Sequence, residues 1–182
     1  MSKSKQERCL QCRLIVQECI CSDITPFWTE HRLTLLTNKR EEYIHSNTGR
    51  LLRLMLENNS LIYIGKKGWE KKIEEEIARS EYTPVIFFPI TPLSDGHEIV
   101  EEKGKPLNII VLDTNWSSAR RWLYKLGSME IKKIGLRTVP PSKYYLRKQP
   151  KKENLCTFQA VTSLLDELGI KNSELATSHM NE

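Results

Sequence analysis

Residues 107–122 read LNIIVLDTNWSSARRW, and this stretch decides the fold. Its first six residues are rich in β-branched side chains, which is typical of a strand buried on both faces. Beyond Asp113 the apolar residues fall at helical spacing, with Ser117 as a suitable N-cap and Gly127 as a suitable end. Asp113 is therefore expected at the carboxyl end of a strand, where ligands bind in open α/β sheets. Alternatively, an Asp at such a turn serves only as a helix cap and binds no ligand.

The same alternation of strand and helix patterns runs along the rest of the chain. It predicts an α/β domain with a mostly parallel sheet and flanking helices. We expect this domain over residues 27–170, after an N-terminal module over 1–26 and before a flexible tail over 171–182. The other predicted strands are 33–36, 61–64, 85–88 and 132–139, and the other predicted helices are 51–56, 69–77 and 158–168.

Composition points to a water-soluble protein. Hydrophobic residues make up 39% of the 182 residues, the mean hydropathy is -0.47, and no apolar run has the length of a membrane span. No signal-peptide pattern is present, so we expect a cytoplasmic location with reduced thiols and no membrane association. Nothing in the sequence indicates an obligate protein partner.

Positive charge is concentrated in one segment. Residues 117–152 hold eleven Lys and Arg against one acid, Glu130, a net +10 in a chain whose total is +5. Trp122, Tyr124 and the pair Tyr144–Tyr145 stand among these cations, and a basic surface with aromatic faces binds phosphates and stacks bases. A basic run can also be only a solvated face. Because the segment adjoins the strand end described above, we expect it to bind nucleic acid.

Four cysteines are clustered near the N-terminus. They follow the pattern C-x2-C-x6-C-x-C within thirteen residues, as Cys9, Cys12, Cys19 and Cys21. Four thiolates at this spacing can bind one tetrahedral zinc, and so short a segment needs the metal to fold. Disulfides are disfavoured by a reducing compartment, and a redox pair needs only one C-x-x-C. We therefore expect a closed, structural zinc site, and Cys156, which stands alone, as a small buried residue.

Several common catalytic motifs are absent from the sequence. The chain has no G-x-G, no G-x-x-x-x-G-K-[ST] and no G-x-S-x-G. The dinucleotide fingerprint, the P-loop and the nucleophile elbow are therefore excluded. The four histidines show no metal-ligand spacing, so a hydrolytic triad is unsupported.

The ordered set of motifs resembles the DTW-domain family, the tRNA-uridine aminocarboxypropyltransferases. The cysteine cluster comes first, followed by SNTGRL at 46–51 and by LDTNW at 112–116 with Ala119-Arg120. LRKQP at 146–150 and LCTFQA at 155–160 complete the set in the family's order. Together the motifs cover nearly the whole chain.

The resemblance implies a SPOUT-like α/β fold with a C-terminal trefoil knot and S-adenosylmethionine as the donor substrate. It implies transfer of the donor's 3-amino-3-carboxypropyl group to N3 of a uridine in tRNA, with release of methylthioadenosine. Asp113 then becomes the general base that accepts the N3 proton. The residues implied for the donor pocket are Asn47, Thr48, Gly49, Arg50, Leu112, Trp116, Leu155, Cys156 and Thr157, and those expected to bind RNA phosphates are Arg120, Arg121, Arg147 and Lys151.

Some of these assignments have a simpler interpretation. The Asn47-Thr48-Gly49 turn fits a helix cap as well as a ligand loop, and Trp116 fits a core position as well as a stacking role. The chain also departs from the family pattern. Asn38-Lys39 stands where the family usually has His-Pro, Asn115 where it has Thr, and Cys156 and Gln159 where it has Ser and Glu.

Two other functions remain open at the level of the sequence. One is a SPOUT-type RNA methyltransferase, which uses the same donor and releases adenosylhomocysteine. The other is a zinc-stabilised RNA-binding protein without catalysis, in which the altered motifs mark a lost activity.

Overall fold

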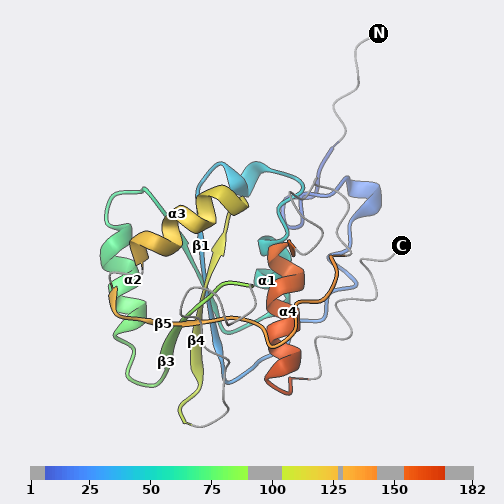
Figure 1. The fold of residues 1–182 in the computed structure, drawn as a ribbon. Helices are drawn as coiled ribbons and strands as arrows, with labels where there is room; N and C mark the ends of the chain where they lie inside the picture. The colour runs from blue at the N-terminus through green and yellow to red at the C-terminus, as the bar shows by residue number, and fades with distance from the viewer. Residues whose placement is uncertain (1–6, 90–103, 127–128, 143–153, 171–182) are drawn as a thin grey trace.

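The computed structural model describes residues 7–89, 104–126, 129–142 and 154–170 (Figure 1). Over these residues the chain forms five parallel strands and four α-helices, which confirms the predicted α/β class with a parallel sheet. None of these helices is long and apolar enough to cross a membrane. The strands are β1 Arg32–Thr37, β2 Asn59–Tyr63, β3 Thr83–Phe87, β4 Leu107–Asp113 and β5 Lys132–Ile134, and the helices are α1 Gly49–Met55, α2 Trp69–Ile77, α3 Trp116–Leu126 and α4 Thr157–Glu167.

The strand order places β1 and β4 side by side in the middle of the sheet. The order is β2-β1-β4-β3-β5. From the carboxyl end of β1 the chain passes through α1 to β2 at one edge, and from the carboxyl end of β4 it passes through α3 to β5 at the other edge. The connections diverge at this point, which is the arrangement that opens a ligand crevice in parallel α/β sheets.

Helices cover both faces of the sheet because the central strands are apolar on both faces. Leu35, Ile109 and Val111 pack in one core with residues of α1 and α4. Leu36 and Ile110 pack in the other core with residues of α2 and α3. Figure 1 shows the two helix pairs on opposite sides of the strands.

A polar chain inside the sheet fixes the register of β1 and β4. Asn108 is fully buried, and its Oδ1 accepts a hydrogen bond from Thr34 Oγ1 at 2.8 Å. Its Nδ2 donates to the carbonyl of Glu76 at 2.9 Å, at the end of α2. A slip by one residue breaks both bonds, so Thr37 is held opposite Asp113.

Several sequence-based boundaries were wrong, among them the start of β2, which lies at Asn59, two residues earlier than predicted. β5 stops at Ile134 instead of Val139, because it pairs only with the last three residues of β3, which itself ends at Phe87. α1 begins at Gly49, two residues earlier than predicted. The N-cap of α3 is not Ser117, since Asn115 Oδ1 accepts from the N–H of Ser118 at 3.0 Å.

Several expectations fall outside the described residues and stay predictions. These are the helix end at Gly127, the tail over 171–182, the RNA contacts of Arg147 and Lys151, and the aromatic pair Tyr144–Tyr145. A C-terminal knot would involve the chain between β5 and α4, half of which is also outside the described residues.

Candidate functional site

Asp113 ends β4 as a buried carboxylate held from both sides. Only 5% of the residue is exposed. Its Oδ2 accepts a hydrogen bond from Asn47 Nδ2 at 2.9 Å, and its Oδ1 accepts one from Thr157 Oγ1 at 2.9 Å. Asn47 comes from the loop after β1 and Thr157 is the first residue of α4. Asp113 therefore does not cap α3, and the site joins three distant segments of the sequence.

Gly49 is required by the position of Asp113. A Cβ atom at residue 49 would collide with the carboxylate carbon and both carboxylate oxygens. The glycine was expected to let the backbone approach a ligand, and in the structure the group that approaches the backbone is the Asp113 side chain. The carboxylate consequently lies at the first residue of α1, where backbone amides favour negative charge.

The surroundings make Asp113 a stronger base than an exposed aspartate. Burial raises its pKa above the ordinary value. The hydrogen bonds from Asn47 and Thr157 lower this pKa in part, the negative charge of Glu41 raises it, and the positive charge of Arg50 lowers it. A carboxylate whose pKa is raised holds a proton more readily, which suits a proton acceptor working near neutral pH.

A narrow slot of about 40 Å³ lies beside this carboxylate, between α3, α4 and the ends of β3 and β4. Thr157 lines the slot and also donates a hydrogen bond to Asp113, so it connects the slot with the carboxylate. The ring of Trp116 meets that of Phe88 edge-on, with centroids 5.2 Å apart, so Trp116 packs in the core and also faces the slot. The lining is mostly apolar and includes Phe87, Phe88, Leu112, Thr114, Trp116, Leu155 and Thr157.

Thr48 and Cys156 shape the site by holding the start of α4. Thr48 Oγ1 accepts from the N–H of Phe158 at 3.2 Å. Cys156 Sγ accepts from the N–H of Gln159 at 3.5 Å, so this cysteine is both buried and the N-cap of α4. The Cys156 thiol donates in turn to Gln159 Oε1 at 3.8 Å. The two residues that depart from the family pattern in this block therefore contact each other.

Arg50 lies apart from the slot. Its Nη2 donates to the carbonyls of Glu42 at 2.9 Å and Ile44 at 2.6 Å. The side chain lines a second cavity of about 300 Å³, together with Arg13 and Arg53. Burial, and then the positive charge of Arg13, lower the pKa of Arg50.

The basic helix α3 begins directly after the Asp113 turn. Arg120 and Arg121 are exposed on it, and Tyr124 is 87% exposed. Trp122, expected on the same surface, instead packs edge-on against Trp69 with ring centroids 5.3 Å apart. The described part of the basic segment thus offers exposed cations with one exposed aromatic ring.

The four cysteine sulfurs are gathered at one point. All four Sγ atoms lie within 4.8 Å of one another, with Cys9 to Cys21 at 3.7 Å and Cys12 to Cys19 at 3.8 Å. A zinc ion bound tetrahedrally at about 2.3 Å from each sulfur places the sulfurs about 3.8 Å apart. The cluster therefore fits zinc with no open position, and its sulfurs are too far apart for disulfides.

Ionisation of the cysteine cluster also favours a cation. Hydrogen bonds from the backbone amides of Cys12 and Gln11 lower the pKa of Cys9 to about 6. Burial and the neighbouring thiols raise the pKa of Cys21 to about 12. The first thiolate thus forms easily and the last with difficulty, so a full set of four thiolates needs a divalent cation at its centre.

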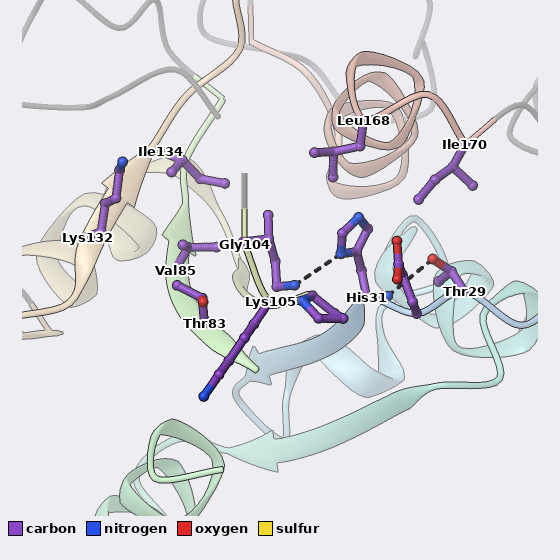
Figure 2. Close-up of a pocket in the computed structure, with 13 residues that line it drawn as sticks. Thr29, His31, Thr83, Val85, Gly104, Lys105, Lys132, Ile134, Leu168 and Ile170 are labelled. Atoms are coloured by element: carbon purple, nitrogen blue, oxygen red, sulfur yellow. Dashed lines mark hydrogen bonds between the residues drawn. The ribbon is translucent and has the colours of Figure 1, made fainter. Parts of the chain in front are cut away.

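A larger cavity, about 410 Å³, opens at the other end of the sheet (Figure 2). It is lined by the starts of the strands and by the end of α4, including His31, Thr83, Lys105 and Leu168. His31 Nδ1 accepts from the N–H of Leu107 at 3.0 Å, so the imidazole is part of the strand framework.

Sequence reasoning missed two residues of the site. Thr37 Oγ1 donates to the carbonyl of Asp113 at 2.8 Å and ties the two strand ends together. Glu41 is 3% exposed and close enough to raise the pKa of Asp113. Thr37 is a polar residue at the end of a buried strand, and this pattern is the signal that could have placed it in the site.

Comparison with known proteins identifies a family by sequence. No solved structure matches the chain. The family model of the DTW domain matches residues 6–180, nearly the whole chain, and covers the cysteine cluster, the Asp113 turn and α4. The chain therefore belongs to the DTW domain family, the family of tRNA-uridine aminocarboxypropyltransferases.

Proposed function

We propose that the protein transfers the 3-amino-3-carboxypropyl group of S-adenosylmethionine to N3 of a uridine in tRNA. Membership in the DTW domain family points to a tRNA-modifying transferase. The observation that carries the finer assignment is the buried carboxylate of Asp113, held by Asn47 and Thr157 at the crevice of the sheet. Its raised pKa is the property that a general base for a weakly acidic N–H requires.

The transfer is a single displacement. Asp113 accepts the proton of uridine N3, and the N3 lone pair then attacks the γ carbon of the donor's methionine arm. The bond from that carbon to the sulfonium breaks, its electron pair stays on sulfur, and methylthioadenosine leaves as a neutral molecule. Positioned proton transfer of this kind contributes about 10²–10⁴-fold to the rate.

In this mechanism the remaining donor residues position the reacting groups. The small apolar slot at Leu112, Trp116 and Leu155 suits the carbons beside the sulfonium. Asn47 and Thr157 orient the two carboxylate oxygens, and Gly49 leaves room for them. Thr48 and Cys156 set the start of α4 and so the position of Thr157.

The zinc and the basic surface complete the proposal. Zinc at the four cysteines has a structural role, since all four positions of a tetrahedral ion are taken by thiolates. Arg120 and Arg121, with Arg147 and Lys151, bind tRNA phosphates. The knotted, SPOUT-like arrangement of the C-terminal region belongs to the same proposal.

Product analysis tests the function directly. Purified protein with S-adenosylmethionine and tRNA should release methylthioadenosine, and nucleoside mass spectrometry should find a uridine carrying the added group. Adenosylhomocysteine as the product would indicate a methyltransferase instead. Binding of tRNA without any binding of the donor in calorimetry would indicate an RNA-binding protein without catalysis.

A further inference from the structure

Three arginines face one cavity where the cysteine module meets the main domain. The cavity holds about 300 Å³ and is lined by Arg13, which follows Cys12, and by Arg50 and Arg53 of α1. Phe27, the residue that follows the module, ties the chain to the end of α1, because its N–H donates to the carbonyl of Met55 at 2.9 Å. The arginines thus come from two separate parts of the chain.

Arg50 carries an unsatisfied buried group at this cavity. The residue is only 7% exposed, and its Nη1 has no hydrogen-bond partner among the described residues. A buried guanidinium N–H left without an acceptor is unfavourable and rare in folded proteins. The Arg50 side chain lines the cavity, so a small shift of the guanidinium brings this N–H to an oxygen acceptor bound there.

The charge balance around the cavity is positive. Glu42 is the one acid in the lining, and it faces three guanidinium groups. Burial and the hydrogen bond with Glu42 raise the pKa of Tyr63 to about 12, so this carboxylate is already engaged with the Tyr63 hydroxyl. The repulsion of Arg13 against Arg50 favours an anionic ligand between them.

We propose that this cleft, formed by Arg13, Arg50 and Arg53, binds a backbone phosphate of tRNA beside the reacting nucleotide. The inference rests on the proposed function, because it takes tRNA as the substrate. Planar guanidinium groups bind phosphate oxygens in pairs, and Arg50 supplies the buried donor. Arg50 directly follows Gly49, where an added Cβ would meet the Asp113 carboxylate, and the charge of Asp113 raises the pKa of Arg50 in part.

The rim of the cleft favours a nucleic acid over a small anion. The guanidinium of Arg13 lies over the ring of Tyr43, 5.8 Å from its centroid, and Tyr43 is 63% exposed. Leu10, in the cavity wall, is 82% exposed. Exposed aromatic and aliphatic groups beside a phosphate site are what the faces of nucleotide bases contact.

The test compares two variants with a matched control in the zinc-loaded, full-length protein. Arg53→Ala removes an exposed cation from α1. Arg13→Gly removes the second cation and suits the left-handed backbone there, where φ is 64°. Lys105→Ala removes an equal charge from the wall of the larger cavity, outside the cleft (Figure 2). Affinity for tRNA is measured at several salt concentrations, and donor affinity by calorimetry.

Each cleft variant should bind tRNA about threefold to tenfold more weakly, with the slope of log affinity against log salt reduced by about 0.7–0.9. Lys105→Ala should change neither quantity, and donor affinity should stay the same in all three. Unchanged salt slopes in the cleft variants, with normal tRNA binding by wild type, overturn this inference alone. Loss of donor affinity instead would assign the cleft to the donor carboxylate and also overturn it. A wild-type protein that does not bind tRNA at all contradicts the proposed function as well.

Discussion

The two ends of the parallel sheet differ: the larger cavity lies at one end, and the buried carboxylate with its hydrogen-bond donors lies at the other. The amino end has the larger cavity, about 410 Å³ against about 40 Å³ for the slot at the carboxyl end. Yet its polar groups serve the framework: His31 accepts from a strand amide, and Lys105 Nζ donates to the carbonyl of Ser80 at 2.7 Å. At the carboxyl end, a carboxylate is buried between donors from distant segments. Convergent, desolvated groups mark the reactive end better than volume does.

The largest expected effect comes from Asp113→Asn at the carboxyl end. Single-turnover transfer should fall by about 10²-fold or more, because the proton acceptor is lost while size is kept. Because the folded-state pKa of Asp113 is raised, its linkage contribution favours folding at low pH and is lost as pH rises through that pKa. The variant should therefore melt at or above the wild-type temperature near neutral pH, as a thermal scan can check. Full activity would remove Asp113 from the catalytic role.

Gly49→Ala tests whether the transfer rate depends on the position of the Asp113 carboxylate as well as on its presence. The new methyl group meets the Asp113 side chain and must displace it, so stability should fall by about 1–3 kcal/mol. Transfer should fall about tenfold or more, since a misplaced base loses rate. Gly65→Ala is the control: its Cβ meets nothing within 4 Å, but φ is 81°, so it should lose stability without a matching loss of rate per folded molecule.

Removal of zinc tests how far tRNA binding depends on the N-terminal cysteine module, which lies outside the sheet. Chelation, or Cys9→Ser, should weaken tRNA binding by about the threefold to tenfold expected for Arg13→Gly, because Arg13 follows Cys12 of the cysteine cluster. Chelation of the Arg13→Gly variant should then add little. Hydrogen exchange at the first residues of β3 and β4 should stay unchanged, and an altered exchange there would contradict an independent amino end.

Thr157→Val probes the electrostatics of the carboxyl end. The hydrogen bond from Thr157 lowers the pKa of Asp113, so its loss should move the acid limb of the transfer rate toward higher pH. Thr162→Val is a matched control in α4, because the Thr162 hydroxyl bonds only the carbonyls of Phe158 and Gln159 in the hydrogen bonds described for it. A pH profile that moves in Thr162→Val and stays fixed in Thr157→Val would contradict the assignment.

The smallest effect is expected at the amino end. Lys105→Ala lies in the wall of the larger cavity and removes one exposed hydrogen bond. Stability should change by about 0.5 kcal/mol or less, and the transfer rate should match wild type. A clear loss of transfer in this variant would show that the larger cavity takes part in the reaction and would undo the contrast between the two ends.

Local patterns in the sequence were enough to find the elements that carry the site. The β-branched run before Asp113 indicates a strand that is buried on both faces of the sheet. The change from this run to helical spacing places Asp113 at the turn between the strand and the next helix. Fine boundaries were harder, because Asn115 and Ser117 are both good caps and only the backbone decides between them. The length of β5 depends on where its partner β3 ends, which no pattern within β5 records.

The partners of Asp113 could not be derived from spacing. Asn47 lies 66 positions before it and Thr157 lies 44 positions after it. The family resemblance grouped these residues, but the individual bonds depend on where the loop after β1, the end of β4 and the start of α4 meet. Trp122 illustrates the reverse: its place among cations suggested an exposed ring, whereas the nearby Trp69 covers it.

The distance in sequence between the partners of Asp113 also sets the order in which the site can appear during protein synthesis. The ribosome releases Asn47 early, then β4, and Thr157 only near the end of the chain. Since parallel pairing of β1 with β4 joins residues 76 positions apart, the sheet itself must wait for β4 to emerge. Until α4 follows, Asp113 lacks one of its two hydrogen-bond donors and the cover that α4 provides. Every nascent chain that ends between Asp113 and Thr157 therefore carries the carboxylate without its finished surroundings.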